Sequence, residues 1–136
     1  MALGITKLSN QAIESAESVA ATALEWASDT GGTVLNAGAG ERFIDVNLQI
    51  SITFHASATL GAELHTRKSA DDGTTKNTPE KGTFAKSIAV SAGNTVIVTH
   101  SVYNFDYLDI GIKNLDAAQV LTYTAIYEGQ KMTGMD

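Results

Sequence analysis

Hydrophobic and polar side chains alternate strictly along residues 42–54, whose sequence is RFIDVNLQISITF. Every second residue is apolar, which gives one face made of Ile44, Val46, Leu48, Ile50, Ile52 and Phe54. This period of two is typical of a β-strand with one buried side, whereas a helix would scatter these residues around its axis. At about 3.3 Å per residue the run spans roughly 36 Å, so we expect it to form the spine of a sheet.

Five later segments show shorter runs that also suit strands. Turn-forming residues separate them, and they cover residues 60–68, 84–90, 95–103, 107–115 and 120–127. No helical period lies between successive segments, so neighbouring strands are joined by short turns. The sequence therefore predicts an all-β fold, an antiparallel two-sheet β-sandwich of the jelly-roll kind.

We expect a single domain with two parts, since 136 residues suit one core. The sandwich is expected to occupy residues 37–136, and residues 1–36 are expected to hold an N-terminal arm followed by a helix or a first hairpin. The arm, residues 1–9, should dock on its own domain or on a neighbour, because it carries three apolar side chains: Leu3, Ile5 and Leu8.

Residues 10–28 fit two kinds of secondary structure. The alanine-rich sequence has an apolar helical face, a capping residue in Asn10 and an early acidic residue in Glu14, where the helix dipole favours it. The alternative is a strand over residues 18–26 that turns back into residues 33–36. The helix is favoured over the strand, although tertiary packing often overrides such local preferences.

The composition excludes several classes of function. The net charge is −6 and the pI is about 4.9, which argues against general binding to nucleic acid or to anionic membranes. No apolar run is long enough to cross a bilayer. The sequence contains no cysteine, so disulfides and thiol chemistry do not contribute. We therefore expect a soluble protein that is made in a cytosol.

The motifs that could carry chemistry are all weak. Residues 38–40, Gly-Ala-Gly, lack the third glycine and the following helix of a dinucleotide site. The three histidines, His55, His65 and His100, have no spacing that brings them together on a metal. Residues 71–73, Asp-Asp-Gly, suit a turn better than a calcium loop. We expect no metal, no cofactor and no enzymatic activity.

Surplus apolar residues and uneven charge indicate contacts between copies of the chain. The strand at 95–103 is apolar on both faces, and residues 66–86 carry five basic against three acidic side chains, whereas both ends of the chain are acidic. The predicted contact residues are Leu3, Ile5, Leu8, Arg67, Lys68, Lys76, Lys81, Ile97, Tyr103 and Ile126.

The order of these features over residues 33–128 resembles small virion proteins of bacteriophages, namely capsid decoration (cement) proteins and tail accessory proteins. Many of these are cysteine-free β-sandwiches of this size that are rich in Ala, Gly, Ser and Thr. The resemblance implies a non-enzymatic structural protein of the virion, assembled in the host cytoplasm. Its implied partners are further copies of itself, with a trimer favoured, and a major capsid or tail lattice protein.

A second resemblance lies in residues 69–73, Ser-Ala-Asp-Asp-Gly. This turn is similar to turns in discoidin-like carbohydrate-binding sandwiches, which implies a carbohydrate-binding or receptor-adhesion module as the alternative function. The tryptophan often found soon after that turn is missing here, because residues 74–76 are Thr-Thr-Lys. Most aromatic side chains lie in the last third of the chain, at Tyr103, Phe105, Tyr107, Tyr123 and Tyr127. They could stack on a sugar or anchor an interface, but the core and rim of the sandwich are the favoured places for them.

Overall fold

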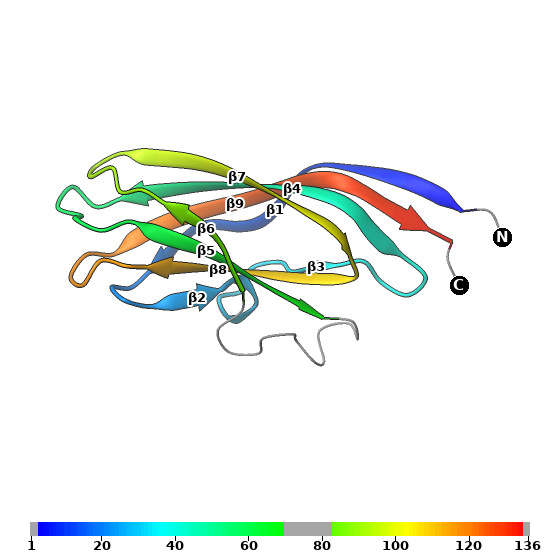
Figure 1. Cartoon of the computed structure of the whole chain (residues 1–136), viewed down its shortest axis with the longest axis horizontal. Coiled ribbons are helices and arrows are strands. Elements are labelled where there is room, and N and C mark those ends of the chain that lie inside the picture. The colour runs from blue at the N-terminus through cyan, green and yellow to red at the C-terminus, as the bar shows by residue number, and fades with distance from the viewer. Residues whose placement is uncertain (1–2, 70–82, 135–136) are drawn as a thin grey trace.

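The computed structural model describes residues 3–69 and 83–134, which form two antiparallel β-sheets packed face to face (Figure 1). Sheet A has the strand order β1 (Gly4–Val19), β9 (Leu121–Thr133), β4 (Arg42–Phe54) and β7 (Thr95–Phe105). Sheet B has the order β2 (Leu24–Trp26), β8 (Tyr107–Asn114), β5 (Ala62–Ser69) and β6 (Thr83–Ile88), and β3 (Leu35–Asn36) also pairs with β8. The predicted all-β sandwich is confirmed.

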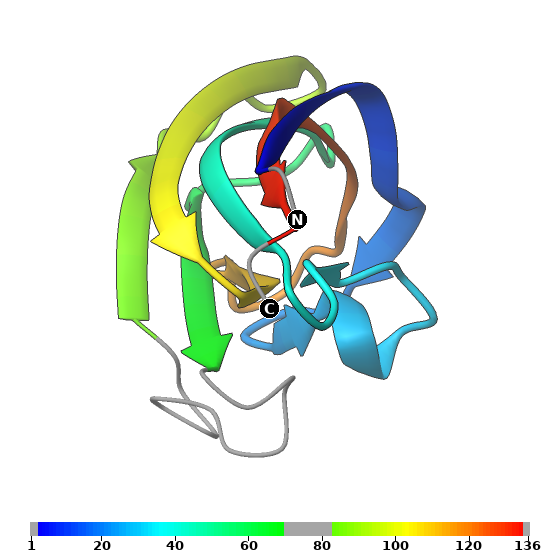
Figure 2. The same cartoon turned by 90° about the vertical axis from the view of Figure 1, so that its right-hand side faces the viewer.

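The chain crosses between the two sheets at nearly every connection. Only β2 and β3, and the hairpin of β5 and β6, are consecutive strands of one sheet. This order is that of an eight-stranded jelly roll, with β3 as a short addition. An end-on view shows the strands encircling a single core (Figure 2). The crossovers place β4 and β9, which are distant in sequence, side by side in the middle of sheet A.

The spine predicted at residues 42–54 is β4, which is hydrogen-bonded on both sides, to β9 and to β7. The predicted alternation of burial holds from Val46 to Phe54. The alternation fails at Ile44, where the pairing of β4 with β9 shifts its register. The side chain of Phe43 is therefore buried in the core in place of Ile44. Phe43 stacks on Phe105 with ring centres 5.0 Å apart and closes this end of the core.

The helix favoured for residues 10–28 is wrong, because β1 and β2 occupy this segment with a single 3-10 turn, η1 (Ala27–Asp29), after them. Three register shifts in the pairing of β1 with β9 explain the error. Each shift interrupts the period of two, so the sequence shows no continuous alternation. Asn10 and Ala16 take positive φ angles of 50° next to these bulges, and only Ile13 and Val19 of β1 are fully buried.

The segment expected to be an arm is the first part of β1. Residues 4–8 pair with residues 129–133 of β9, which extends to Thr133. Leu8 packs against the core, whereas the side chains of Leu3 and Ile5 are exposed. None of the residues in the two described ranges belongs to a helix that could cross a membrane.

The assigned facing of β4 is tested by two neighbouring substitutions. Ile50 is fully buried, and Gln49 beside it points to solvent. Ile50→Asp places an unpaired charge in the core and should lower the free energy of unfolding by several kcal/mol. Gln49→Asp should change it by less than about 0.5 kcal/mol under conditions where the protein is monomeric. Urea unfolding of both variants measures the difference, and equal losses would contradict the facing.

Candidate functional site

The candidate surface is the side of sheet A that points away from the core, here called the outer face of sheet A. The residues opposite each other on neighbouring strands define it, because Gln49 of β4 lies between Thr99 of β7 and Ile126 of β9. Side chains of the same facing are Asp45, Asn47, Ser51, Thr53, Thr95, Ile97, Ser101, Tyr103, Thr122, Thr124, Glu128 and Gln130.

This face is poor in charge and carries isolated apolar side chains. Hydroxyl and amide groups make up most of it, and Asp45 and Glu128 are the charged members contributed by β4 and β9. Ile97 is 61% exposed and Tyr103 is 64% exposed, which is unusual for the outward side of a sandwich. A shallow hollow of about 340 Å³ lies between Tyr103 and Lys7.

The structure brings four of the predicted contact residues onto this one face. The pairing of β7 and β9 with β4 places on this face the side chains of Ile97, Tyr103 and Ile126. Ile5 of β1 lies on the same face, because it pairs with Met132 of β9, which in turn pairs with Arg42 of β4. Leu3 directly precedes β1 and is exposed, and Leu8 packs on the core instead. Of the predicted basic contacts, Lys68 lies near the end of β5, and Lys76 and Lys81 lie outside the described residues.

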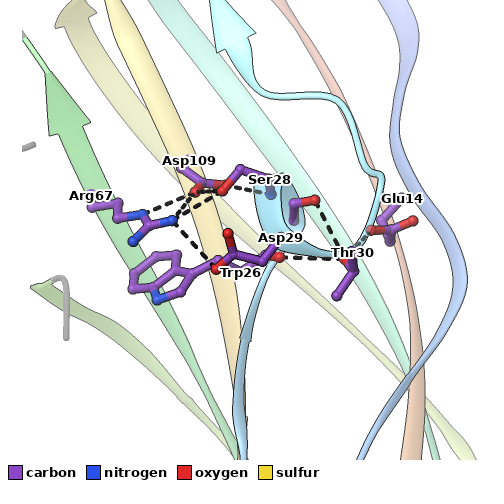
Figure 3. Close-up of polar contacts among 8 residues, drawn as sticks. Glu14, Trp26, Ser28, Asp29, Thr30, Arg67 and Asp109 are labelled. Atoms are coloured by element: carbon purple, nitrogen blue, oxygen red, sulfur yellow. Dashed lines mark hydrogen bonds and ion pairs between the residues drawn. The ribbon is translucent and has the colours of Figure 1, made fainter. Parts of the chain in front are cut away.

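The structure differs from the prediction that Arg67 contacts a neighbouring copy, because the Arg67 side chain is buried within its own chain. The guanidinium donates from Nε to the carboxylate of Asp109 at 2.9 Å and from Nη2 to the same oxygen at 2.8 Å (Figure 3). Its carbon lies 4.2 Å from the ring centre of Trp26, and Nη2 also donates to the Ser28 hydroxyl at 3.0 Å. Arg67 is 6% exposed and Asp109 is not exposed at all.

The cluster fixes the edge strand β2 and the following turn η1 against β8 of sheet B. The Ser28 hydroxyl and backbone N–H both donate to Asp109, and the Thr30 hydroxyl donates to Glu14 of β1 at 2.7 Å (Figure 3). Trp26 lies directly on Gly111 of β8, where any Cβ would come within 2.7 Å of the indole. Glycine at this position therefore allows the ring to cover the ion pair.

The arrangement suits a structural clamp rather than catalysis. Asp109 accepts hydrogen bonds on both oxygens, and the Ser28 hydroxyl is held by Arg67 and Asp109 rather than by a base that could activate it. The histidines lie elsewhere: His65 contacts Glu63 on sheet B, and burial together with the Lys86 ammonium lowers the pKa of His100. Within residues 3–69 and 83–134, no three His, Asp or Glu side chains are placed to hold a metal.

A second polar cluster joins the loops at one end of the sandwich. Asp116 accepts from the backbone N–H groups of Thr59 at 2.8 Å, Ala118 at 2.9 Å and Gln119 at 3.0 Å, and these bonds hold the pKa of its carboxyl far below the ordinary value. Asn114 donates to the carbonyl oxygens of residues 19 and 119. The cluster thus ties together the connections β1–β2, β4–β5 and β8–β9.

Comparison with known proteins gives fold-level similarity at most. No protein-family model and no curated protein matches the sequence. A chain from Bacillus endospore appendages, described as a novel family of disulfide-linked pili, matches 98% of this chain and 89% of its own length, with 15% identity and a TM-score of 0.35. The present sequence contains no cysteine for such links. The molecule is therefore defined by its fold as a small jelly-roll protein.

The clamp predicts a strong dependence of stability on the buried ion pair. Arg67→Met leaves Asp109 buried without its cation and should lower the free energy of unfolding by about 3–5 kcal/mol. Lys113→Met, a half-buried cation on the same side of β8, should cost less than about 0.5 kcal/mol. The double variant Arg67→Met/Asp109→Asn should lose less than the sum of the single losses, and additive losses in chemical denaturation would contradict the coupling.

The Asp116 cluster predicts a pH dependence. Because its pKa is depressed in the folded protein, the carboxylate contributes stability above the ordinary Asp pKa of about 3.9, and this contribution is lost as the pH falls toward the folded value. Asp116→Asn should therefore lower the melting temperature at pH 7, and the gap to the wild type should shrink below about pH 4. A gap that stays constant in melting curves from pH 7 to pH 2 would contradict this.

Proposed function

We propose that the protein is a non-enzymatic structural component of a bacteriophage particle, a capsid decoration (cement) or related accessory protein that works as a homo-oligomer. The observation that supports this most directly is the outer face of sheet A. Four predicted contact residues from three strands, Ile5, Ile97, Tyr103 and Ile126, gather on it.

The chemistry of this face suits contact between copies of the chain. Each copy carries a net charge of −6, so charged surfaces of two copies repel each other. A face of hydroxyl and amide groups with scattered Ile and Tyr avoids most of that repulsion, and aromatic residues are enriched in interface cores. Burying Ile97 and Tyr103 between copies would remove the exposed apolar surface that one sandwich leaves over.

The fold agrees with this role without establishing it. Jelly rolls occur in viral capsid proteins and in lectins, so architecture alone does not select one function. The partner that we propose beyond the chain itself is a major capsid or tail lattice protein, and the trimer is the stoichiometry implied by the resemblance to decoration proteins. The proposed location is the virion, after assembly in the host cytoplasm.

A carbohydrate-binding or adhesion module is the second candidate, and one cleft favours it. A hollow of about 470 Å³ lies between the edges of the two sheets, where β6 and β7 diverge, and the exposed aromatic side chains of Phe84 and Tyr103 are among its lining residues. Aromatic faces stack on sugar rings. Retention of the monomeric protein on a glycan array, lost in Tyr103→Ala, would favour this function over the structural one.

The structural role is tested by molar mass in solution. Light scattering over a range of concentrations should show an oligomer for the full chain, and Ile126→Glu should shift it to the monomer, since a charge on the interface must be desolvated or repelled. Val120→Glu is the matched control, because Val120 is also an exposed apolar residue but lies in the loop before β9. It should leave the mass unchanged.

A monomer at every concentration would overturn the structural proposal. The same result would move the carbohydrate-binding candidate ahead. If an oligomer is found, it is incubated with purified phage particles, and negative-stain imaging tests whether it attaches to their lattice.

A further inference from the structure

Three of the four edges of the two sheets carry devices that prevent a further strand from adding. On sheet B, β2 and β3 have only three and two residues, and β6 has six. On sheet A, β1 is long, but three register shifts break up its edge, and the carbonyl oxygen of Ile13 is already bonded to the N–H of Thr33. Short edge strands and bulges are the usual protection against edge-to-edge pairing.

The fourth edge, β7, lacks these devices over residues 95–103, and its left-handed residue, Asn104 with a φ of 55°, lies next to its C-terminal end. It has 11 residues, its pairing with β4 shows no register shift from Phe43↔Phe105 to Thr53↔Thr95, and it contains no Lys, Arg, Asp, Glu, Gly or Pro. Its outward side chains are exposed, with Ile97 and Tyr103 among the most exposed apolar residues of the molecule. A long, regular and uncharged edge is a template for strand addition.

The backbone groups that such an addition needs point away from the sheet at alternate residues of β7. The carbonyl oxygen of Thr99 marks them, because it accepts a hydrogen bond at 2.9 Å from Lys86 of β6, on the side opposite β4. By the same alternation, Ile97, Ser101 and Tyr103 present their N–H and C=O groups to this side. The strands β6 and β7 diverge toward the end of β7 (Figure 1). Residues 100–103 of β7 line the 470 Å³ cleft, so among the described residues this part of the edge faces a cleft.

We propose that β7 pairs antiparallel with β7 of a second copy, so that two sheets A join into one continuous sheet across a two-fold axis. The occupant is a second copy because a strand paired antiparallel with itself is self-complementary under two-fold symmetry. No charged side chain of β7 opposes the approach of two acidic molecules. The contact borders the outer face of sheet A, so the inference rests on the proposed function and adds an edge contact beside that face.

This geometry gives a dimer as the first assembled unit, in contrast to the trimer implied by the resemblance. The side chain of Lys86 opposes this dimer. Its ammonium group donates a hydrogen bond to the carbonyl oxygen of Thr99, and an added strand would need the same oxygen. A lysine at a sheet edge is a known restraint on edge pairing. Lys86 therefore sets how readily the dimer forms.

The edge is tested by Ser101→Pro against Ser101→Ala in the full chain. Proline removes the outward N–H at a position where the monomer does not use it, so edge strands tolerate it. We expect the dimer of Ser101→Pro to be roughly tenfold weaker or more in sedimentation equilibrium, since symmetry removes the donor twice. Ser101→Ala should dimerise like the wild type. Ile97→Lys, a charge on the edge that keeps every N–H, should also weaken the dimer if Ser101→Pro fails to fold.

Lys86→Met gives a change in the opposite direction. Removing the competing ammonium should tighten the dimer severalfold, because the Thr99 carbonyl is then open to the partner. Hydrogen exchange should show the amides of Ile97, Thr99 and Ser101 protected at high protein concentration and exchanging rapidly after dilution, while the amides of β4 stay protected at both concentrations.

The outcomes separate this inference from the proposed function. An oligomer that Ser101→Pro, Ile97→Lys and Lys86→Met leave unchanged, and whose β7 amides exchange rapidly, would overturn the edge pairing and leave the structural role standing. A monomer at all concentrations would overturn both. Protection of the β7 amides only when a different protein is added would replace the second copy by that protein and equally overturn the inference.

Discussion

The burial of one side of β4 is the constraint on which the rest of the fold depends. β4 is bonded on both edges, and its side chains from Val46 to Phe54 alternate between a dry core and solvent. A shift of one residue would turn the whole apolar set outward, so the register of β7 and β9 is fixed with it. The outer face of sheet A is therefore a direct consequence of the same pattern that builds the core.

The two sheets differ in how their outward sides are covered. On sheet B the edge strand β2 pairs with β8, and the indole of Trp26, the Arg67–Asp109 pair and the Ser28 hydroxyl close off polar groups on the outward side of the sheet (Figure 3). A buried ion pair of this kind contributes little net free energy but is costly to break, so it acts chiefly to hold one geometry. The outer face of sheet A has no such cover from the described part of the chain, and its Ile97 and Tyr103 stay exposed.

The sequence was sufficient for the strands whose alternation is uninterrupted. Residues 42–54 and the strands predicted at 95–103 and 107–115 were located to within a few residues, because burial on one side imposes a period of two, whereas β9 runs six residues beyond its predicted end. β1 was missed, since its bulges and the positive φ angles of Asn10 and Ala16 remove that period and leave an alanine-rich stretch that suits a helix.

The candidate surface was predicted in part for a similar reason. Ile97, Tyr103 and Ile126 stand out because they are apolar at positions where a sandwich strand should be polar, and this signal is local. The role of Arg67 is not local, because its partners come from two distant parts of the chain, Trp26 and Ser28 from one and Asp109 from the other. Two signals were present, an aspartate inside an apolar strand and the single tryptophan, but nothing in the sequence shows that they meet.

The contrast between the two sheets also bears on where a partner binds. Residues that cover sheet B are held by ion pairs and short hydrogen bonds, so a partner on that side would have to displace a buried charge pair. On sheet A a partner meets exposed hydroxyl, amide and isolated apolar groups that are already in a rigid, regular array, so little ordering cost opposes the contact. The regular edge of β7 adds backbone groups that the two sheet B edges, with strands of two to six residues, offer only over short lengths. Both the face and the edge thus support the proposal that copies of the chain meet on the sheet that is built around β4.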